Sequence, residues 1–481
     1  MTDPSIIGAG VHAPRYRIDA DTIAEAWGRV QAAGVAEKRV AAADEDALTM
    51  GAAAARRALD AAGIEAGNIA ALTFATTTPP LAEEALTPRL AAFLGVENAV
   101  HRSLGSSTRA GTQALLVAAD TAAFPALVVA ADCPRGEPNS PEEHAAGAGA
   151  AAFVVDAHAE GTGAALTERA EYVADYPGTR FREQGEGPVH GLGISSYDRQ
   201  AYRECVSGAI GRLEADIVGA AEALALQAPD GKRPGRAAGV LDTDAKLFTV
   251  ATDHGDLGAA SAPAALAQAL AAGCGSVLAV GFGSGAGADA LLFEGTTPVV
   301  SNADQETEVV DYPQYLRLRG ELDSGSPAGG GAQVSVPSWR RQRGARYRLD
   351  AGHCPKCGAL AFPADGACPE CHNLGAYEPT RLSHTGTVET VTGVSPGGAP
   401  PEFAQQAERG GDFGVAIVSF PPQNAETAET AETERTASVP MQVTETDPER
   451  VEAGDAVEAV IRRIYTQEGV TRYGRKVRPT E

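Results

Sequence analysis

The sequence predicts an α/β protein that continues into a small cysteine module and a small antiparallel barrel. Near-continuous apolar runs are typical of strands buried on both faces, and they occur at residues 126–132, 149–156, 246–253 and 276–283. Stretches with helical periodicity lie between such runs, as at residues 46–63. Strands that alternate with helices indicate α/β architecture.

The composition describes a large, acidic and lysine-poor protein. The chain has 481 residues, which favours two to four domains, and 44% of them are hydrophobic, which is enough for packed cores. Its formal net charge is −24, and only five of the 39 basic residues are lysines. This pattern favours a halophilic protein of a high-salt cytoplasm over a merely acidic one. The negative charge argues against a nucleic-acid partner, because phosphates would be repelled.

The sequence shows no recognisable targeting signal, and this observation and the use of cysteine both favour a cytoplasmic protein. The first residues show no basic region followed by an apolar run, and no window approaches the roughly 18 apolar residues of a membrane span. Four of the seven cysteines cluster late, whereas Cys133, Cys205 and Cys274 are scattered. That distribution is typical of a reduced compartment with one metal site.

The last third of the chain changes character. Charged residues and a Gly/Ser/Pro cluster predict a linker or docking segment at 323–348. Short alternating runs then predict the strands of a small antiparallel barrel, at residues 386–394, 414–420, 438–445 and 455–465. The repeat AETAETAETE predicts a solvated, disordered acidic loop at 424–435.

Two CxxC pairs predict a structural metal site. Cys354 with Cys357, and Cys368 with Cys371, can present four thiolates tetrahedrally, and such soft ligands select zinc or iron. Structural zinc is the favoured interpretation, and a rubredoxin-like iron site is the alternative, for which this spacing is short. A closed four-cysteine site leaves no position for a substrate, so zinc catalysis is not expected. The neighbouring His353 and His372 are interpreted as bystanders.

Several motifs, in order along residues 1–322, resemble archaeal 3-hydroxy-3-methylglutaryl-CoA synthases. They include IIGAGVHAPRYRIDADTIAEAWGR (6–29), EKRVAAADEDALTMGAAAARRAL (37–59), RAGTQAL (109–115), YPGTRFREQGEGPVHG (176–191), FGSGAGADALLF (282–293) and DYPQYLRLRGEL (311–322). The resemblance implies a thiolase-like fold with two related βαβαβ halves, at 1–155 and 156–322, packed as five layers and usually dimeric.

The C-terminal modules are similar to the zinc-ribbon/OB-fold proteins that accompany archaeal acyl-CoA condensing enzymes. We therefore expect a zinc ribbon at 349–376 and an OB-fold domain at 377–481. In that family the small protein bridges a thiolase and the synthase, whereas here both modules lie in one chain. The resemblance thus implies a thiolase (acetyl-CoA acetyltransferase) as partner, a homodimer, structural zinc and a CoA thioester as ligand.

The catalytic positions depart from the family pattern. The family's acylated cysteine begins a CKAGT-like motif, and here Thr108 begins TRAGT. The family glutamate lies in an SES-like turn, and Thr77 holds its place in TTT. The family histidine of HQPxGK is matched by Gln227, with Lys232 retained, and the asparagine of a GN turn by Asp256. A threonine hydroxyl is a weak nucleophile without an adjacent base, and its ester is a poorer acyl donor than a thioester.

Other groups in the sequence could substitute for these catalytic residues. A base at His254 could serve a hydroxyl nucleophile at Ser107 or Thr108. Cys133 is interpreted as a packed thiol and His190 as a structural histidine. The segment GSGAG at 283–287 is interpreted as a tight strand-to-strand turn and not as a phosphate loop.

These observations support two main functional hypotheses. The first is a degenerate synthase-like subunit that binds acyl-CoA and assembles with a thiolase. The second is an active acyltransferase that uses a hydroxyl nucleophile or direct acyl transfer; an ordinary HMG-CoA synthase and a structural protein with a blocked pocket are further alternatives. Candidate groups for CoA phosphates are Arg109, Lys232 and Arg233, which could equally be ordinary surface charges.

Overall fold

The chain folds into two compact units in a computed structural model. The structure describes residues 3–157, 163–185, 187–214, 219–239, 244–322, 336–395, 398–423, 436–467 and 469–480. One unit comprises Met1–Ala41 with Glu45–Tyr315, and the other comprises Ala42–Asp44 with Leu316–Glu481. Residues 42–44, which the sequence analysis placed in the N-terminal half, therefore belong to the second unit. The predicted loop at 424–435, and residues 323–335 of the predicted linker, lie outside the described residues.

The large sheet of the first unit contains the same strand order twice. The first half runs β5-β4-β6-β7-β1 and the second runs β10-β9-β11-β12-β8. In each half the first three strands are parallel and the last two join antiparallel. The bounds are β1 (Ser5–His12), β4 (Ala71–Ala75), β5 (Val100–Leu104), β6 (Ala126–Asp132), β7 (Gly149–Asp156), β8 (Gly163–Tyr176), β9 (Ala223–Leu226), β10 (Lys246–Phe248), β11 (Ser276–Gly283) and β12 (Gly285–Thr296). The repeated order confirms the two related halves.

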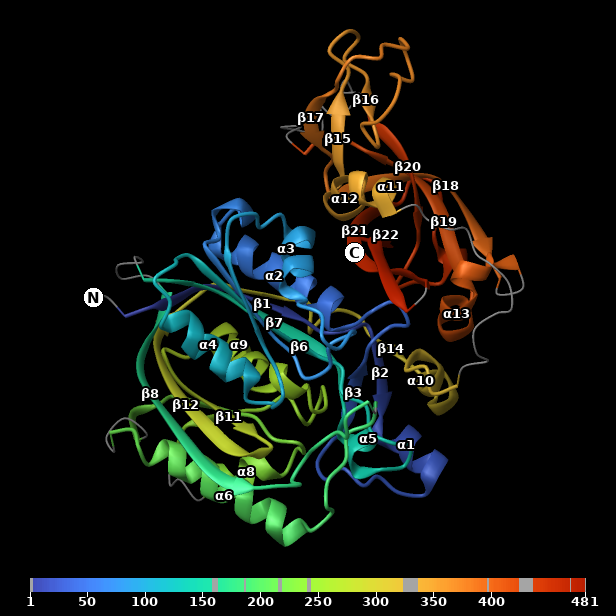
Figure 1. The fold of residues 1–481 in the computed structure, drawn as a ribbon. Helices are drawn as coiled ribbons and strands as arrows, with labels where there is room; N and C mark the ends of the chain where they lie inside the picture. The colour runs from blue at the N-terminus through green and yellow to red at the C-terminus, as the bar shows by residue number, and fades with distance from the viewer. Residues whose placement is uncertain are drawn as a thin grey trace. The chain divides into compact units, whose positions relative to one another are not determined.

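Helices complete five layers around these strands (Figure 1). Helix α2 (Ala47–Ala62) packs on β1, β6 and β7, and α6 (Ser195–Ile210) packs on β8, β11 and β12. Helices α4 (Ala110–Ala119) and α9 (Ser261–Ala271) contact each other and lie between the two halves of the sheet. Alanine-rich, mostly buried faces let these inner helices approach the strands closely.

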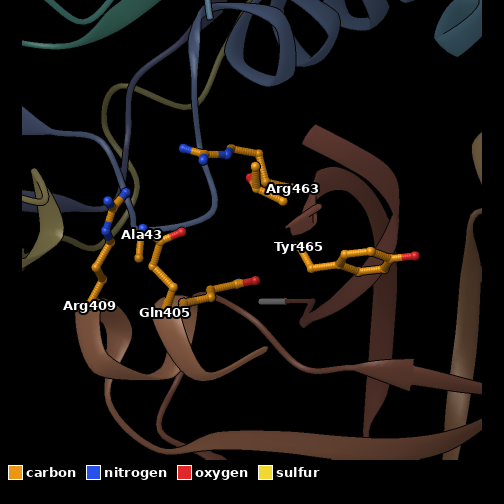
Figure 2. A pocket seen from close by; sticks show the side chains of 7 residues that line it. Ala43, Gln405, Arg409, Arg463 and Tyr465 are labelled. Atoms are coloured by element: carbon orange, nitrogen blue, oxygen red, sulfur yellow. The ribbon is translucent and has the colours of Figure 1, made fainter. Parts of the chain in front are cut away.

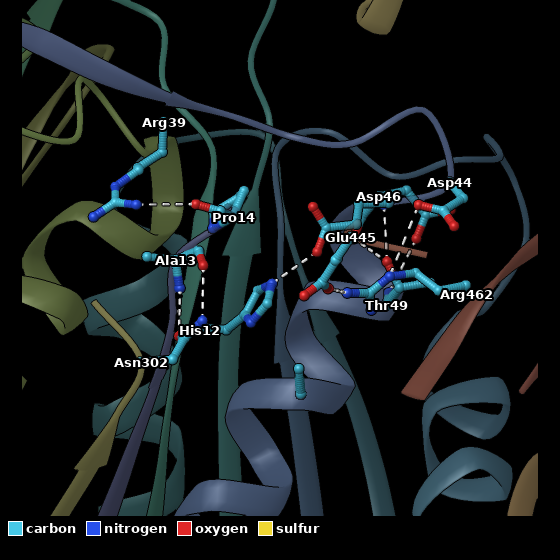
Figure 3. A network of polar contacts seen from close by, with 12 residues as sticks. His12, Ala13, Pro14, Arg39, Asp44, Asp46, Thr49, Asn302, Glu445 and Arg462 are labelled. Carbon is cyan, nitrogen blue, oxygen red and sulfur yellow. Dashed lines mark hydrogen bonds and ion pairs between the residues drawn. The ribbon is translucent and has the colours of Figure 1, made fainter. Parts of the chain in front are cut away.

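Local sequence signals place the ends of two of these helices. Asp46 accepts a hydrogen bond from the Thr49 backbone N–H while the Thr49 side chain accepts one from the Asp46 N–H, so α2 begins with a capping box (Figure 3). Near the start of α4, a Cβ at Gly111 would lie 1.9 Å from the Ala259 carbonyl oxygen. Only glycine therefore lets α4 approach the short helix η2 (Gly258–Ala260) this closely.

Smaller elements surround the five layers. A separate sheet has the order β14-β2-β3, and β13 joins the large sheet beside β1. The remaining elements are β2 (Tyr16–Asp19), α1 (Ala20–Trp27), β3 (Glu37–Val40), η1 (Ala66–Asn68), α3 (Thr87–Leu94), α5 (Pro141–Ala145), α8 (Arg233–Ala238), β13 (Val299–Ser301), β14 (Glu308–Val309) and α10 (Tyr312–Leu318).

The second unit contains a small three-stranded ribbon and a nearly closed antiparallel barrel. The ribbon sheet has the order β16-β15-β17, and the barrel sheet has the order β20-β19-β18-β21-β22. A bridge between Val443 and Val477 brings the end of β20 beside β22, so the barrel almost closes. The bounds are β15 (Asp350–His353), β16 (Leu360–Ala361), β17 (Glu378–Arg381), β18 (Thr385–Val394), α13 (Pro401–Gly410), β19 (Phe413–Phe420), β20 (Ala437–Gln442), η4 (Pro448–Arg450), β21 (Ala456–Gln467) and β22 (Val470–Pro479).

The structure differs from the sequence-based expectations at three places. Part of the predicted linker is helical, with α11 (Val336–Arg341) and α12 (Arg343–Arg348). The predicted strand at 246–253 ends at Phe248, because the chain then turns toward η2. Strand β22 lies outside the predicted strands, because its basic residues hide the alternation of apolar and polar positions. In the described part of the chain, no helix is long and apolar enough to cross a membrane.

Candidate active site and metal centre

The turn between β5 and α4 presents the predicted nucleophile position. Ser106 adopts a left-handed backbone conformation with φ 71°, and Thr108 follows just before the helix. The Thr108 side chain is 4% exposed, and its Oγ1 donates a hydrogen bond of 2.7 Å to the carbonyl oxygen of Phe282 at the end of β11. A buried hydroxyl thus finds its partner in the backbone of the other half of the fold.

Gln227 is held by the same residue. The backbone N–H of Phe282 donates to Gln227 Oε1 at 2.7 Å, and the Gln227 side chain is buried after β9. Thr108 and Gln227 therefore satisfy the carbonyl and the N–H of one residue. These two predicted positions therefore lie close together, and both side chains hold the end of β11.

The turn Thr76–Thr78 holds a buried carboxylate. Asp132, at the end of β6, is 0% exposed and accepts hydrogen bonds from three threonine hydroxyls, from two backbone N–H groups of the turn and from the Ala259 N–H. The six distances lie between 2.7 and 2.9 Å. Thr77 thus donates from both its backbone and its hydroxyl to Asp132, which is typical of a buried ion that needs full hydrogen bonding.

Asp132 was not among the predicted site residues. A signal for it exists, because an ionisable residue ends the otherwise apolar run ALVVAAD. A Cβ at Gly258 would lie 2.2 Å from Asp132 Oδ2, so η2 also approaches this carboxylate closely. The carboxylate joins the end of a strand in one half to the start of a helix in the other.

Asp256, like Asp132, is buried and has partners for both of its carboxylate oxygens. Its Oδ1 accepts from the Gly258 N–H at 3.0 Å and from Ser261 Oγ at 3.2 Å, and its Oδ2 pairs with Arg180. Arg182, two residues after Arg180, donates a hydrogen bond to the carbonyl oxygen of Thr77. These two arginines were not among the predicted site residues, and they connect the segment after β8 to two of the four predicted catalytic positions.

The three basic residues predicted to bind CoA phosphates lie in different surroundings. Arg109 is mostly buried, donates from Nε to both oxygens of Asp289 at 3.2 Å, and pairs with Glu171 at 3.1 Å. Two carboxylates already match its charge, which favours a structural role. Lys232 is exposed, whereas Arg233 pairs with Asp230 at 2.9 Å.

The structure separates the proposed base from the hydroxyl turn. Burial, reinforced by Arg39, lowers the pKa of His254 to about 4. Among the described residues no hydrogen bond links His254 to Ser107 or Thr108, and His254 Nδ1 is buried without a partner. The charges that act on its ring are those of Arg39 and Asp304.

The remaining candidates fit structural interpretations. Cys133 Sγ lies 3.9 Å from Thr78 Oγ1, and burial raises the pKa of Cys205 to about 11, which keeps that thiol protonated. His190 exchanges two backbone hydrogen bonds with Phe181. The GSGAG segment is confirmed as a tight turn, because β11 and β12 pair antiparallel on either side of Ser284.

The metal centre lies in the ribbon. The sulfur atoms of Cys354, Cys357, Cys368 and Cys371 all lie within 4.8 Å of one another, and two of the pairs are separated by 3.6 Å. Tetrahedral zinc with Zn–S bonds of about 2.3 Å needs sulfur atoms about 3.8 Å apart. The donor set therefore fits zinc, which would join the two CxxC turns.

Comparison with protein-family models identifies one segment. Residues 341–375 match the model of the ChsH2 rubredoxin-like zinc ribbon domain. This match confirms the predicted zinc ribbon and agrees with the four-cysteine cluster.

Comparison with curated proteins finds relatives that match about two thirds of the chain. The chain is 31% identical to the hydroxymethylglutaryl-CoA synthase of Pyrobaculum aerophilum in an alignment 346 residues long that covers 66% of this chain and 98% of that protein. It is 29% identical to the enzyme of the same name from Methanococcus maripaludis in an alignment 349 residues long that covers 67% of this chain and 99% of that protein.

Solved structures show the same fold at lower identity. An HMG-CoA synthase complexed with CoA superposes with a TM-score of 0.58 at 16% identity, over 69% of this chain and 94% of that one. The 3-oxoacyl-[acyl-carrier-protein] synthase III of Aquifex aeolicus superposes with a TM-score of 0.53 at 19% identity, over 60% and 99%. These likenesses support the thiolase-like architecture described above.

Proposed function

The chain belongs to the hydroxymethylglutaryl-CoA synthase family, and from that premise we propose that it is a catalytically reduced member. In this proposal it binds an acyl-CoA and acts as an assembly subunit for a partner thiolase in a high-salt, halophilic archaeal cytoplasm. The proposal concerns the site, because membership of the family does not by itself preserve a reaction.

The environment of Thr108 carries the proposal. Its hydroxyl proton is committed to the Phe282 carbonyl, so the oxygen has no general base to which it could transfer that proton. Among the described residues, the hydroxyl has no hydrogen-bonded histidine or carboxylate. A nucleophilic hydroxyl needs such a neighbour.

The other three positions support the same interpretation. Thr77 holds Asp132, Gln227 holds the Phe282 N–H, and Asp256 is paired with Arg180. Each side chain that replaces a family catalytic group satisfies another buried polar group. These replacements indicate that the side chains at the former catalytic positions stabilise the fold and no longer provide acid–base chemistry.

Acyl-CoA binding and the partner follow from the family and from the second unit. A solved synthase of this fold binds CoA. Lys232 is exposed, and we propose that it and Arg233 remain the candidates for CoA phosphates. The zinc ribbon and barrel are similar to modules that bridge a synthase and a thiolase, which supports a thiolase as partner.

An active acyltransferase is the second candidate. Ser107 favours it, because this hydroxyl is only half-buried and lies beside Thr108; a Cβ at Gly283 would lie 2.1 Å from Ser107 Oγ. Direct acyl transfer without a covalent intermediate belongs to the same alternative.

Intact-protein mass measurement tests for an acyl-enzyme, and an assay for condensation by the purified chain tests for direct acyl transfer. We expect the wild-type chain to show no acyl adduct after incubation with acetyl-CoA, whereas Thr108→Cys should gain one acetyl group because a thiolate attacks a thioester readily. Ser106→Cys, at an exposed neighbouring position, controls for a thiol that is merely added to the turn. An adduct on residues 106–108 of the wild type, or condensation that Thr108→Val abolishes, would favour the active enzyme.

Co-purification tests the assembly role. The tagged chain should retain a thiolase that has its own cysteines when both are produced together in high salt. A chain that binds acyl-CoA but never retains a thiolase would contradict the assembly role and leave the binding role standing.

A further inference from the structure

The second unit contains three residues from far upstream in the sequence. Ala42–Asp44 belongs to this unit although the residues on either side belong to the other. The Asp44 carboxylate is buried, and it lies 2.9 Å from Lys476 Nζ, 2.9 Å from Thr444 Oγ1 and 3.8 Å from Arg462 Nε. We call Thr444, Arg462 and Lys476 the carboxylate socket.

The backbone of the tripeptide is held as well. The Arg463 N–H of β21 donates to the Asp44 carbonyl oxygen at 3.0 Å. Ala43 lines a small cavity beside α13 and β21, with Gln405, Gln406, Arg409, Arg463, Tyr465 and Thr466 (Figure 2). The segment is therefore bound by its side chain and its main chain, as a docked peptide is.

The charges of the socket require the Asp44 carboxylate. Arg462 is 1% exposed and Lys476 is 2% exposed, so neither can be solvated by water. Arg462 also pairs with Glu445 (Figure 3). Glu445 in turn pairs with Arg478 at 2.9 Å. Without Asp44, Lys476 would keep no carboxylate within ion-pair distance among the described residues, and an uncompensated buried charge is strongly destabilising.

The residues that follow Asp44 are anchored in the first unit. Glu45 Oε1 lies 2.8 Å from His12 Nε2, and both side chains are buried. Asp46 caps α2, which packs on the central strands. Three consecutive carboxylates thus have three separate buried partners, and the first of them belongs to the other unit.

We propose that Ala42–Asp44 is an internal docking peptide, recognised through the Asp44 carboxylate by the carboxylate socket of the barrel. This docking makes residues 42–44 part of the packing of the barrel, 400 positions before Thr444 in the sequence. The inference does not depend on whether the condensing site is active.

Cleavage of the folded chain tests this proposal. A protease site placed within 323–335 of the full chain allows it to be cut after purification. We expect the two fragments to co-elute in gel filtration, both in 0.1 M and in 2 M KCl, because buried ion pairs are screened much less than exposed ones. Separation of the wild-type fragments at both salt concentrations would overturn the proposal.

Substitution of Asp44 gives the decisive comparison. Asp44→Asn should weaken retention of the C-terminal fragment on the order of a hundredfold, since it breaks a buried pair. Asp21→Asn, on exposed α1, is the matched control and should retain the fragment as the wild type does. Equal retention by Asp44→Asn and the wild type would contradict the docking role.

Two further variants distinguish loss of the Asp44 contacts from misfolding of the whole chain. Thr444→Val removes only one hydrogen bond to Asp44 and should weaken retention several-fold. Lys476→Met should weaken retention much less in an Asp44→Asn background than in the wild type, because the two residues act as a pair. Additive losses would indicate that the two side chains stabilise the barrel separately, and would overturn the recognition of Asp44 by Lys476.

Discussion

At the scale of single residues, buried polar groups decide the character of the candidate site. Asp132 accepts six hydrogen bonds that come from both halves of the first unit. Thr108, Gln227 and Asp256 are likewise satisfied by partners within the fold. A side chain that is already fully hydrogen-bonded stabilises a structure, but it has little freedom to move a proton.

His254 gives the residue-scale prediction, a dependence of stability on pH. Its folded pKa of about 4 lies below the value of about 6.5 in an unfolded chain, so the unfolded state binds more protons between these two pH values. Stability should therefore fall as the pH drops from 6.5 to 4, with an upper limit of about 3 kcal/mol. Urea unfolding at several pH values measures this slope.

Substitution identifies the group responsible for that slope. His254→Gln should flatten the stability curve in this window, whereas His101→Gln, on the exposed strand β5, should leave it unchanged. A curve that keeps its slope in His254→Gln would assign the effect to other groups.

At the scale of elements, duplication explains where the site lies. Helices α4 and α9 occupy equivalent places in the two halves, and both begin near the contact of Gly111 with Ala259. The Thr108 turn precedes one helix and Asp256 with η2 precedes the other. Positions far apart in the sequence therefore meet because the fold repeats.

The outer edge of β5 gives the first element-scale prediction, which concerns the expected homodimer. β5 ends the strand order, and Val100 is 48% exposed. The Val100 N–H donates to Ala70, so alternation points the N–H groups of His101 and Ser103 away from β4. His101→Pro should therefore block edge pairing and yield a monomer in light scattering, while His101→Thr should stay dimeric. Equal masses for both variants would exclude this edge as the interface.

The zinc ribbon gives the second element-scale prediction. We expect one zinc per chain by elemental analysis, and removal of zinc with a chelator should speed hydrogen exchange in residues 350–381, because two short turns and three short strands cannot hold a core alone. Exchange in β1 and β6 should stay slow. Cys354→Ser should reproduce the faster exchange in residues 350–381, and the control Cys274→Ser should not. Unchanged exchange after full removal of zinc would contradict a structural role for the metal.

At the scale of the whole molecule, charge is the dominant property. A net charge of −24 on 481 residues repels itself in dilute buffer, and salt screens that repulsion. The screening length falls from about 10 Å at 0.1 M to about 3 Å at 1 M. We therefore expect the midpoint of thermal unfolding to rise steadily between 0.1 M and 2 M KCl. Sucrose, which carries no charge, should produce a smaller rise at equal osmolarity, and a midpoint that does not respond to KCl would contradict adaptation to salt.

Much of the architecture was predictable because it depends on local patterns. The apolar runs at 126–132, 149–156 and 276–283 coincide with β6, β7 and β11, and the periodic stretch at 46–63 contains α2. The two CxxC pairs predicted the metal cluster, because each pair is one local turn. Helices α11 and α12 were missed, since their basic residues read as a linker.

The sequence by itself determined the order of strands, helices and modules, the family resemblance and the four thiolates, because each of these depends on residues close together in the chain. Only the tertiary structure decided what the substituted residues do. The pairing of Thr108 with Phe282, of Thr77 with Asp132 and of Asp44 with Lys476 joins residues 55 to 432 positions apart. No local pattern encodes such partners, because a buried polar group is satisfied by whichever group the packing of the whole fold brings to it.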